Sequence, residues 1–422
     1  MLDRSIAPKV YNFQGFQTPI INKYTLSNGI SCYGIDNHSI NLIRLDIRIY
    51  AGSTFQKKIS VARACINLLQ EGTLHHSAEE IAEKMDFAGA YYSTSSAREY
   101  VGITIYFPKT ATESILLLLT EMLTEATFPE DKINIFKQKI KNELAIKLEK
   151  NAHLGYFKLI ESLYGENHPY GQIANLNNVD AFLREDIVDF YNQYFHAGNI
   201  KLFFAGNLDE SFYNTINQHF EKIQKKDVTL PILNYESSLP AKKIYIEKEN
   251  AVQTSVYIGK RIFTSNNPNW TTCKLLNMVL GGYFGSRLMS NIRESKGLAY
   301  NIYSRMTPML FSGLFYVSAD VNKEQANLVV EEIYAEFSSL QNQLITEEEL
   351  NIVKNYIYGS RLRSFDGVFN QLEQYIELID FQRDESYWQH SLNIIQTTTS
   401  QTLYEIAQTF LNKEDFTEII VG

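Results

Sequence analysis

Cysteine is scarce in this chain of 422 residues. Its three cysteines, Cys32, Cys65 and Cys273, lie far apart, and no two of them have the C-x-x-C spacing. The sequence therefore indicates neither a disulfide framework nor a metal site built from thiolates. Three isolated thiols fit a reducing compartment, and we expect a cytoplasmic location.

Long apolar runs are also missing. No stretch approaches the roughly 18 apolar residues of a membrane helix, so we expect no membrane span. The first residues, MLDRSIAPKVYNFQ, lack the basic segment followed by an apolar segment that a signal peptide needs. A periplasmic location would fit only a mature form from which a leader had been removed.

An excess of positive charge is absent too. The chain has 39 Lys and Arg against 48 Asp and Glu, a formal net charge of −9, which argues against nucleic acid as a partner. With 45% apolar residues, 27 Tyr and 25 Phe, the composition is that of a folded protein. The length exceeds that of one ordinary core and favours two domains.

Local patterns predict alternating strands and helices in the first half. Asn28-Gly29 suits the turn of a hairpin, and apolar residues at every second position over 43–49 predict a half-buried strand. Helices are expected at about 59–71 and at about 77–88, the second with Ser77 as its N-cap.

The second half repeats this order of elements. Residues 223–243 are rich in lysine, contain Pro231 and Pro240 and show no clear period, so they are the best candidate for a linker. A strand, two helical segments, a strand pair and two long helices are expected to follow. We therefore predict an α+β fold of two similar domains, 1–222 and 244–422, each a mostly antiparallel sheet covered by helices.

Five stretches follow one another in an order that is specific for one family. They are LLQEGT (68–73), SSAREYVGITIYF (95–107), KNELAIKLE (141–149), NHPYGQ (167–172) and LNMVLGGYFGSRLMSNIRESKGLAYNIYS (276–304). Together they resemble the pitrilysin/insulinase family of zinc metallopeptidases, the inverzincins, which includes the subunits of the mitochondrial processing peptidase. The resemblance covers nearly the whole chain and implies a half-clamshell of the processing-peptidase type.

The residues directly before the first stretch depart from the family's zinc motif, H-x-x-E-H. In that motif two histidines on one face of a helix bind zinc, and the glutamate between them acts as the base. Alignment on Gly72-Thr73 places Arg63 and Asn67 at the histidine positions and Ile66 at the glutamate position. Arginine has no lone pair to give, an amide oxygen is a poor zinc ligand, and isoleucine binds no proton. We therefore expect no metal in this chain, and zinc only in a partner subunit.

Glu143 stands where the third zinc ligand of the family falls. Two interpretations are open: it is a solvated or salt-bridged residue of an amphipathic helix, or it keeps a relic position inside a chamber. One carboxylate does not hold a zinc ion. No two of the eight histidines stand three or four residues apart, so the sequence offers no second helical pair of ligands.

The last stretch keeps the family's C-terminal signature. The resemblance implies that Arg293 and Tyr300, seven residues apart in RESKGLAY, contact substrate bound at the zinc of the other half or of a partner chain. Gly297 lies between them and suits a sharp exit from a helix. The alternative is that Arg293 pairs with an acid such as Glu294 or Glu247 and that Tyr300 is an interior aromatic.

The motifs of other enzyme classes are absent. Neither the phosphate-loop pattern G-x-x-x-x-G-K-[ST] nor the nucleophile pattern G-x-S-x-G occurs. The resemblance implies a non-catalytic, pseudoprotease subunit that pairs with an H-x-x-E-H-bearing paralogue to form a heterodimeric peptidase degrading peptides. The alternatives are a structural or peptide-binding protein of the same fold without a role in proteolysis, a homodimer, and an enzyme with an unrecognised site.

Overall fold

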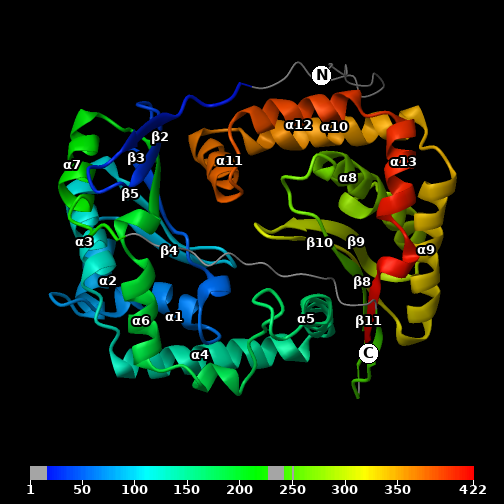
Figure 1. Ribbon diagram of the computed structural model, residues 1–422, viewed down its shortest axis with the longest axis horizontal. Coiled ribbons are helices and arrows are strands. Elements are labelled where there is room, and N and C mark those ends of the chain that lie inside the picture. Colours follow the sequence, from blue (N-terminus) through cyan, green and yellow to red (C-terminus); the bar gives the residue numbers. More distant parts are fainter. Residues whose placement is uncertain (1–16, 227–241, 250) are drawn as a thin grey trace, which may run out of the picture.

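The computed structural model describes residues 17–226, 242–249 and 251–422. It has two halves that face each other, each with one sheet and its own set of helices (Figure 1). Most of the expected linker, 223–243, lies outside the described residues. In the part of the chain that is described, no helix is both long and apolar enough to cross a membrane.

The described part of the first half contains six strands and seven α-helices. The strands are β1 (Asn22–Thr25), β2 (Ser31–Asp36), β3 (Leu42–Ile49), β4 (Tyr91–Ser96), β5 (Val101–Pro108) and β6 (Ile200–Gly206). The helices are α1 (Val61–Leu68), α2 (Ala78–Phe87), α3 (Thr112–Thr124), α4 (Glu130–Glu149), α5 (Asn151–Tyr164), α6 (Arg184–Tyr194) and α7 (Glu210–Phe220).

The second half has five strands and six α-helices within the described residues. The strands are β7 (Lys243–Ile246), β8 (Thr254–Ile262), β9 (Ala299–Pro308), β10 (Gly313–Val321) and β11 (Thr417–Val421). The helices are α8 (Trp270–Asn277), α9 (Ala326–Asn342), α10 (Glu347–Ser364), α11 (Val368–Asp380), α12 (Ser386–Thr397) and α13 (Ser400–Phe410).

The two sheets have the same topology, which confirms the internal repeat that the sequence pattern predicts. Their strand orders are β1-β2-β6-β3-β5-β4 and β7-β11-β8-β10-β9. Apart from the additional edge strand β1, each sheet begins with one parallel pair, β2–β6 or β7–β11. The remaining neighbours in each sheet are antiparallel, so the predicted α+β class with mostly antiparallel sheets is confirmed.

The local signals in the first half are confirmed as well. β1 and β2 form the expected antiparallel hairpin, with Gly29 at a φ of 94° in its turn. The side chain of Ser77 accepts a hydrogen bond from the backbone of Glu80, and Glu80 accepts one from the backbone of Ser77. This capping box starts α2 at the predicted residue.

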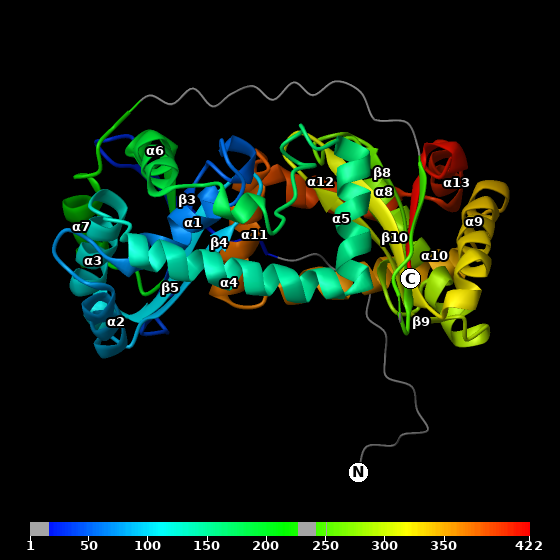
Figure 2. The same cartoon turned by 90° about the horizontal axis from the view of Figure 1, so that it is seen from below.

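One helix of each half packs on the sheet of the other half. The long helix α4 leads across the molecule, and α5 packs on β8 and β11 of the second sheet (Figure 2). In return, α11 packs on β6 of the first sheet. A Cβ added to Gly155 of α5 would lie 2.7 Å from the ring of Tyr257, so α5 approaches its sheet closely.

The exchange of helices corrects one prediction from the sequence. β3 was expected to be half-buried, but its second face is covered too: Arg44 and Arg48 are 5% and 8% exposed, and Asp46 is fully buried. The opposite face carries isoleucine and leucine into the core of the first half. The charged face is buried because α11, from more than 300 residues later in the chain, packs against this sheet.

Candidate functional site

Helix α1 carries the degenerate motif, and it lies between the hydrophobic core of the first half and the space between the two halves. Cys65 and Ile66 are fully buried in the core of the first half. Arg63 and Asn67, one turn apart, share the other face of the helix and are half-buried. The position of the catalytic glutamate is therefore part of the packed core, whereas the two histidine positions carry polar side chains that still reach solvent.

The structure brings Arg63 and Glu143 together. Nη2 of Arg63 donates a hydrogen bond to Oε2 of Glu143 on α4 over 2.6 Å. This hydrogen bond and the charge of Arg63 hold the pKa of the Glu143 carboxyl below its usual value, against partial desolvation. Both open interpretations of Glu143 apply, because it is salt-bridged and it also lines the large cavity described below.

Asn67 completes this arrangement with hydrogen bonds of its own. Its Nδ2 donates to the backbone oxygen of Arg63 over 2.9 Å, and its Oδ1 accepts from Oγ1 of Thr94 on β4 over 3.1 Å. The amide therefore ties α1 to the edge strand of the first sheet. Arg63 and Asn67 thus have protein partners of their own.

These side chains do not fit a zinc ion. A guanidinium group offers no lone pair and carries a permanent positive charge, which repels a cation from the carboxylate of Glu143. Within the described ranges, no group of three or more His, Cys, Asp and Glu residues is arranged to hold a metal. No catalytic step through a metal can be assigned to Arg63, Ile66, Asn67 and Glu143.

A cavity of about 780 Å³ lies between the two halves. Arg63 and Glu143 line it from the first half, Met309 and Leu310 from the turn after β9, and Glu377 from α11. Its size lies within the usual range for ligand pockets in proteins. The motif therefore faces a space that is large enough for part of a peptide.

The charges on the wall of this cavity balance. Its five basic residues are Arg44, Arg48, Arg63, Arg98 and Lys147, and its five acidic residues are Glu99, Glu143, Glu373, Glu377 and Asp380. Several of them pair with each other across the boundary between the halves. The wall carries charges of both signs next to apolar side chains, so it does not select strongly for one sign of charge.

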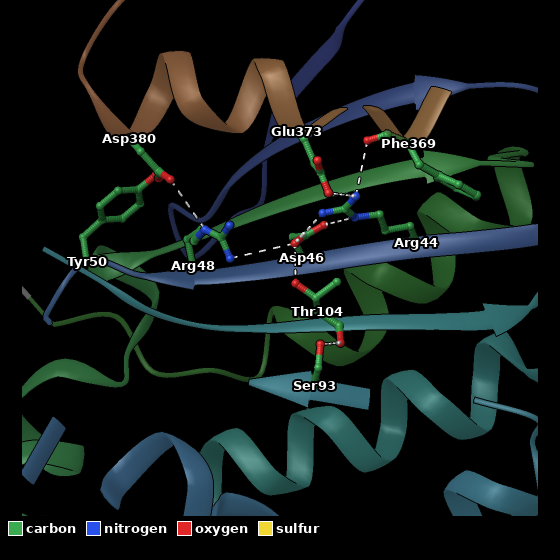
Figure 3. Close-up of polar contacts among 9 residues, drawn as sticks. All are labelled: Arg44, Asp46, Arg48, Tyr50, Ser93, Thr104, Phe369, Glu373 and Asp380. Carbon is green, nitrogen blue, oxygen red and sulfur yellow. Dashed lines mark hydrogen bonds and ion pairs between the residues drawn. The ribbon is translucent and has the colours of Figure 1, made fainter. Parts of the chain in front are cut away.

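Figure 3 shows how β3 and α11 meet through these charges. Arg44 donates to Asp46 on its own strand over 2.7 Å and to Glu373 of α11 over 2.8 Å. Arg48 lies 3.8 Å from Asp46 and 3.7 Å from Asp380. Removing one partner from such a buried network leaves an uncompensated charge, so the network fixes how the two halves face each other.

Asp380 is the most perturbed acid of this network. Burial raises the pKa of its carboxyl to about 6, and the charge of Arg48 acts in the opposite direction. The hydroxyl of Tyr50 donates to Asp380 over 2.9 Å. Lys201, whose ammonium group lies over the ring of Tyr50, is the other cation that lowers this pKa.

A second bridge between the halves uses the His-Pro-Tyr-Gly stretch. The hydroxyl of Tyr170 donates to Glu99 over 2.5 Å and accepts from the backbone N–H of Phe311 over 3.3 Å. Glu99 also accepts from the backbone N–H of Leu310. The stretch that the family resemblance singled out thus holds the turn between β9 and β10 against the first half.

Arg293 and Tyr300 lie on the second half, outside this cavity. Arg293 extends from a π-helical turn, Met289–Ser295, and its guanidinium group lies 5.8 Å from the centre of the Phe284 ring. Gly297 follows at a φ of 62° and turns the chain into β9, as the sequence predicts. Tyr300 is 57% exposed.

The alternative interpretation of this pair is wrong for Tyr300, which is not an interior aromatic. Its hydroxyl donates to Oδ1 of Asn322 over 3.3 Å, and the ring remains accessible. Glu247, named as a candidate partner of Arg293, lies 3.8 Å from Lys323. The pair therefore presents hydrogen-bond donors on the second half.

Comparisons with known proteins agree with the family resemblance that the motifs indicate. A family model described as the Peptidase M16 inactive domain matches residues 181–357. An uncharacterized zinc protease of Bacillus subtilis (strain 168), YmxG, is 24% identical over 362 residues, which cover 84% of this chain and 87% of the relative. An uncharacterized zinc protease of Rickettsia felis (strain ATCC VR-1525 / URRWXCal2) is 24% identical, with 83% and 85% covered. The chain is therefore similar to zinc proteases over most of its length, and residues 181–357 match the M16 inactive domain.

Two solved structures share the fold of this chain. The peptidase M16 inactive domain from Pseudomonas fluorescens superposes with a TM-score of 0.87 at 22% identity, covering 95% of this chain and 98% of that one. A protease from Helicobacter pylori gives a TM-score of 0.87 at 18% identity, with 96% and 100% covered. These similarities agree with the pitrilysin/insulinase resemblance that the motifs indicate, and the match to the M16 inactive domain is limited to residues 181–357.

Sequence reasoning missed the charged face of β3. The signal was present as Arg44, Asp46 and Arg48 at alternate positions. Such a pattern is usually a solvated face, and the carboxylates of α11 that pair with it lie more than 300 residues away in the chain.

Proposed function

We propose that this chain is the non-catalytic subunit of a two-chain M16 peptidase. One observation carries the proposal: an ion pair between Arg63 and Glu143 occupies the place where the family resemblance puts the zinc ligands. A peptidase of this family needs zinc and a base to activate water. Here the position of the base is filled by Ile66, which is fully buried. The hydrolytic centre therefore belongs to another subunit.

The second half carries hydrogen-bond donors that could act on a substrate bound to the partner subunit. Arg293 and Tyr300 are hydrogen-bond donors on the two sides of Gly297, and neither is engaged in an ion pair among the described residues. A guanidinium and a phenol that reach a partner's metal site would hold substrate carbonyls and stabilise the oxyanion of the tetrahedral intermediate. In this proposal they act on a peptide bound at the zinc of an H-x-x-E-H-bearing paralogue, and this chain needs no cofactor.

The cavity between the halves supports a peptide as the substrate. Its volume of about 780 Å³ and its balanced charges suit a short peptide segment better than a polyanion. Pairing with a paralogue would enlarge this space into a closed chamber, which limits the size of the substrate. We expect the complex to degrade peptides in the cytoplasm.

The test combines the purified chain with a purified H-x-x-E-H-bearing M16 paralogue, ideally one encoded beside it. Light scattering after size exclusion measures whether a heterodimer forms, and an internally quenched peptide measures cleavage. The proposal expects zinc in the paralogue alone and full activity only in the mixture. It is overturned if the two chains do not associate, or if the paralogue is fully active by itself.

Two variants separate the proposal from its alternative, a scaffold or peptide-binding protein of the same fold. Arg293→Ala and Tyr300→Phe should leave the heterodimer intact but reduce cleavage in the mixture. If both variants leave cleavage unchanged, the chain supports the partner without contributing to its site.

A further inference from the structure

A second cavity, of about 300 Å³, lies inside the second half. It is bounded by α8, α10, α11 and α12, and α8 lies beneath the layer of α10 and α12 in Figure 1. Most of its wall is aromatic or aliphatic, and it includes Trp270, Met278 and Tyr356. Pro308 and Glu377 line both this cavity and the larger one between the halves, so the two spaces are neighbours.

Three cations line this apolar space: Lys274, Arg361 and Arg383. Glu377 is the acid among the lining residues, and it forms no ion pair within 4 Å with any of the three cationic groups. The larger cavity differs, because Arg44, Arg48 and Arg63 there each have a carboxylate within 4 Å.

The two arginines are held in place by neutral groups. Arg361 donates to Oε1 of Gln374 over 3.3 Å. Arg383 donates to the backbone oxygen of Ser265 over 2.7 Å, and its guanidinium group lies 4.0 Å from the centre of the Tyr387 ring. Both groups are fixed by these contacts but keep their full charge, because neutral acceptors and an aromatic face do not compensate it.

Lys274 is different, because its ammonium group has no hydrogen bond, ion pair or ring contact among the described residues. Its side chain is accessible to solvent and lines the cavity. Desolvation lowers the pKa of Lys274, the charges of Arg361 and Arg383 lower it further, and the charge of Glu377 acts in the opposite direction. An anion placed here would relieve this repulsion.

We propose that this cavity binds a small amphipathic carboxylate, with the carboxylate on Lys274 and the apolar body against the aromatic wall. A monoanion fits better than a phosphate dianion, because one ammonium group is unengaged while the two arginines are already hydrogen-bonded. The volume accommodates one small molecule or the last residue or two of a peptide. Either a free organic acid or the C-terminus of an apolar peptide provides this chemistry. The site does not depend on the proposed pairing with a paralogue.

The chain carries its own reporter for this site. It has two tryptophans, Trp270 and Trp388, and both line the cavity. Titration of the full chain with octanoate should change the tryptophan fluorescence in a saturable way, whereas octanol, of equal chain length without the charge, should bind at least tenfold more weakly. A second titration compares acetyl-trileucine with its C-terminal amide. Whichever of octanoate and acetyl-trileucine saturates the fluorescence change at the lower concentration identifies the source of the carboxylate.

Lys274→Met should weaken binding of the carboxylate at least tenfold, and Lys413→Met, a control lysine of the same half outside the cavity, should leave it unchanged. Glu377→Gln, which removes the acid of the wall, should strengthen binding several-fold. Circular dichroism and the melting temperature establish that each variant is folded. Equal binding of octanoate and octanol together with equal binding of the peptide acid and amide, or undiminished binding by folded Lys274→Met, would overturn the proposal. So would the absence of any saturable fluorescence change with both acids.

Discussion

Arg63 and Glu143, 80 residues apart in the chain, form an ion pair of 2.6 Å at the positions where the family resemblance puts the first and third ligands of a zinc ion. The side chains at these two positions therefore meet, although their chemistry excludes a metal. Both are about one-third exposed, and an ion pair of this kind contributes about 1 kcal/mol or less to stability. The pair can therefore be replaced without unfolding the chain.

The first prediction restores a metal site from this geometry. In a variant with Arg63→His and Asn67→His, two imidazoles one helical turn apart would face Glu143, which makes three protein ligands of the kind that zinc prefers. We expect one zinc ion per chain in the variant, measured by elemental analysis after dialysis, and no stoichiometric zinc in the original chain. Peptidase activity should remain absent, because Ile66 still occupies the position of the base.

Glu143→Gln provides the control for this experiment. Added to the double variant, it should weaken zinc binding at least tenfold, because an amide oxygen replaces the charged ligand. A double variant that is folded yet binds no zinc would mean that residue 67 does not face the same space as residues 63 and 143.

The second prediction concerns the pH dependence of stability at Asp380. Burial raises the pKa of this carboxyl from 3.8 to about 6. The folded state thus binds the proton more tightly than the unfolded state, so the free energy of unfolding falls as the pH rises from about 4 to 6. For this group the fall amounts to about 3 kcal/mol, at 1.36 kcal/mol for each pH unit between the two pKa values.

Asp380→Asn removes the titratable carboxyl but keeps an oxygen that can accept a hydrogen bond from the hydroxyl of Tyr50. We expect urea unfolding between pH 4 and pH 7.5 to give different free energies of unfolding for the original chain and the variant. The size of this difference should change with pH. The exposed Asp366→Asn serves as control and should leave the profile unchanged. Parallel profiles of the Asp380 variant and the original chain would contradict the assignment.

The third prediction tests how closely helix α5 of the first half packs on the sheet of the second half. Gly155→Ala would place a Cβ 2.7 Å from the ring of Tyr257. Such overpacking should lower the free energy of unfolding by about 1–3 kcal/mol. Gly359→Ala in α10 is the matched control, because nothing lies within 4 Å of its added Cβ. It should raise stability by about 0.5–1 kcal/mol, through helix propensity alone. Equal effects of the two variants in urea unfolding would show that α5 does not pack closely on β8.

The fourth prediction applies to the proposed heterodimer. Tyr300→Phe removes one hydroxyl from an exposed ring, so the stability of the chain should not change. If this hydroxyl stabilises an oxyanion in the partner's site, kcat for a quenched peptide should fall about a hundredfold with little change in KM. Tyr245→Phe is the control, since Tyr245 is similarly exposed at 54% on the same half. A loss of activity of similar size in both variants would argue against a specific role of Tyr300.

Much of the fold could be predicted from the sequence, because its signals are local. The hairpin at Gly29, the cap at Ser77 and the exit from the helix at Gly297 each depend on residues within a few positions of one another. Two strands gave no such signal. The polar run YYSTSS forms β4, and β7 has only four residues, so neither shows an alternation of apolar residues.

The missing chemistry follows from the amino-acid sequence alone, because an arginine, an isoleucine and an asparagine cannot replace two histidines and a glutamate in any fold. The contacts that replace this chemistry depend on the three-dimensional arrangement of the chain. Glu143 reaches Arg63 across 80 residues, and α11 buries the charges of β3 across more than 300. Such contacts depend on how two sheets exchange their helices, and no periodicity along the chain records which residues that exchange brings together.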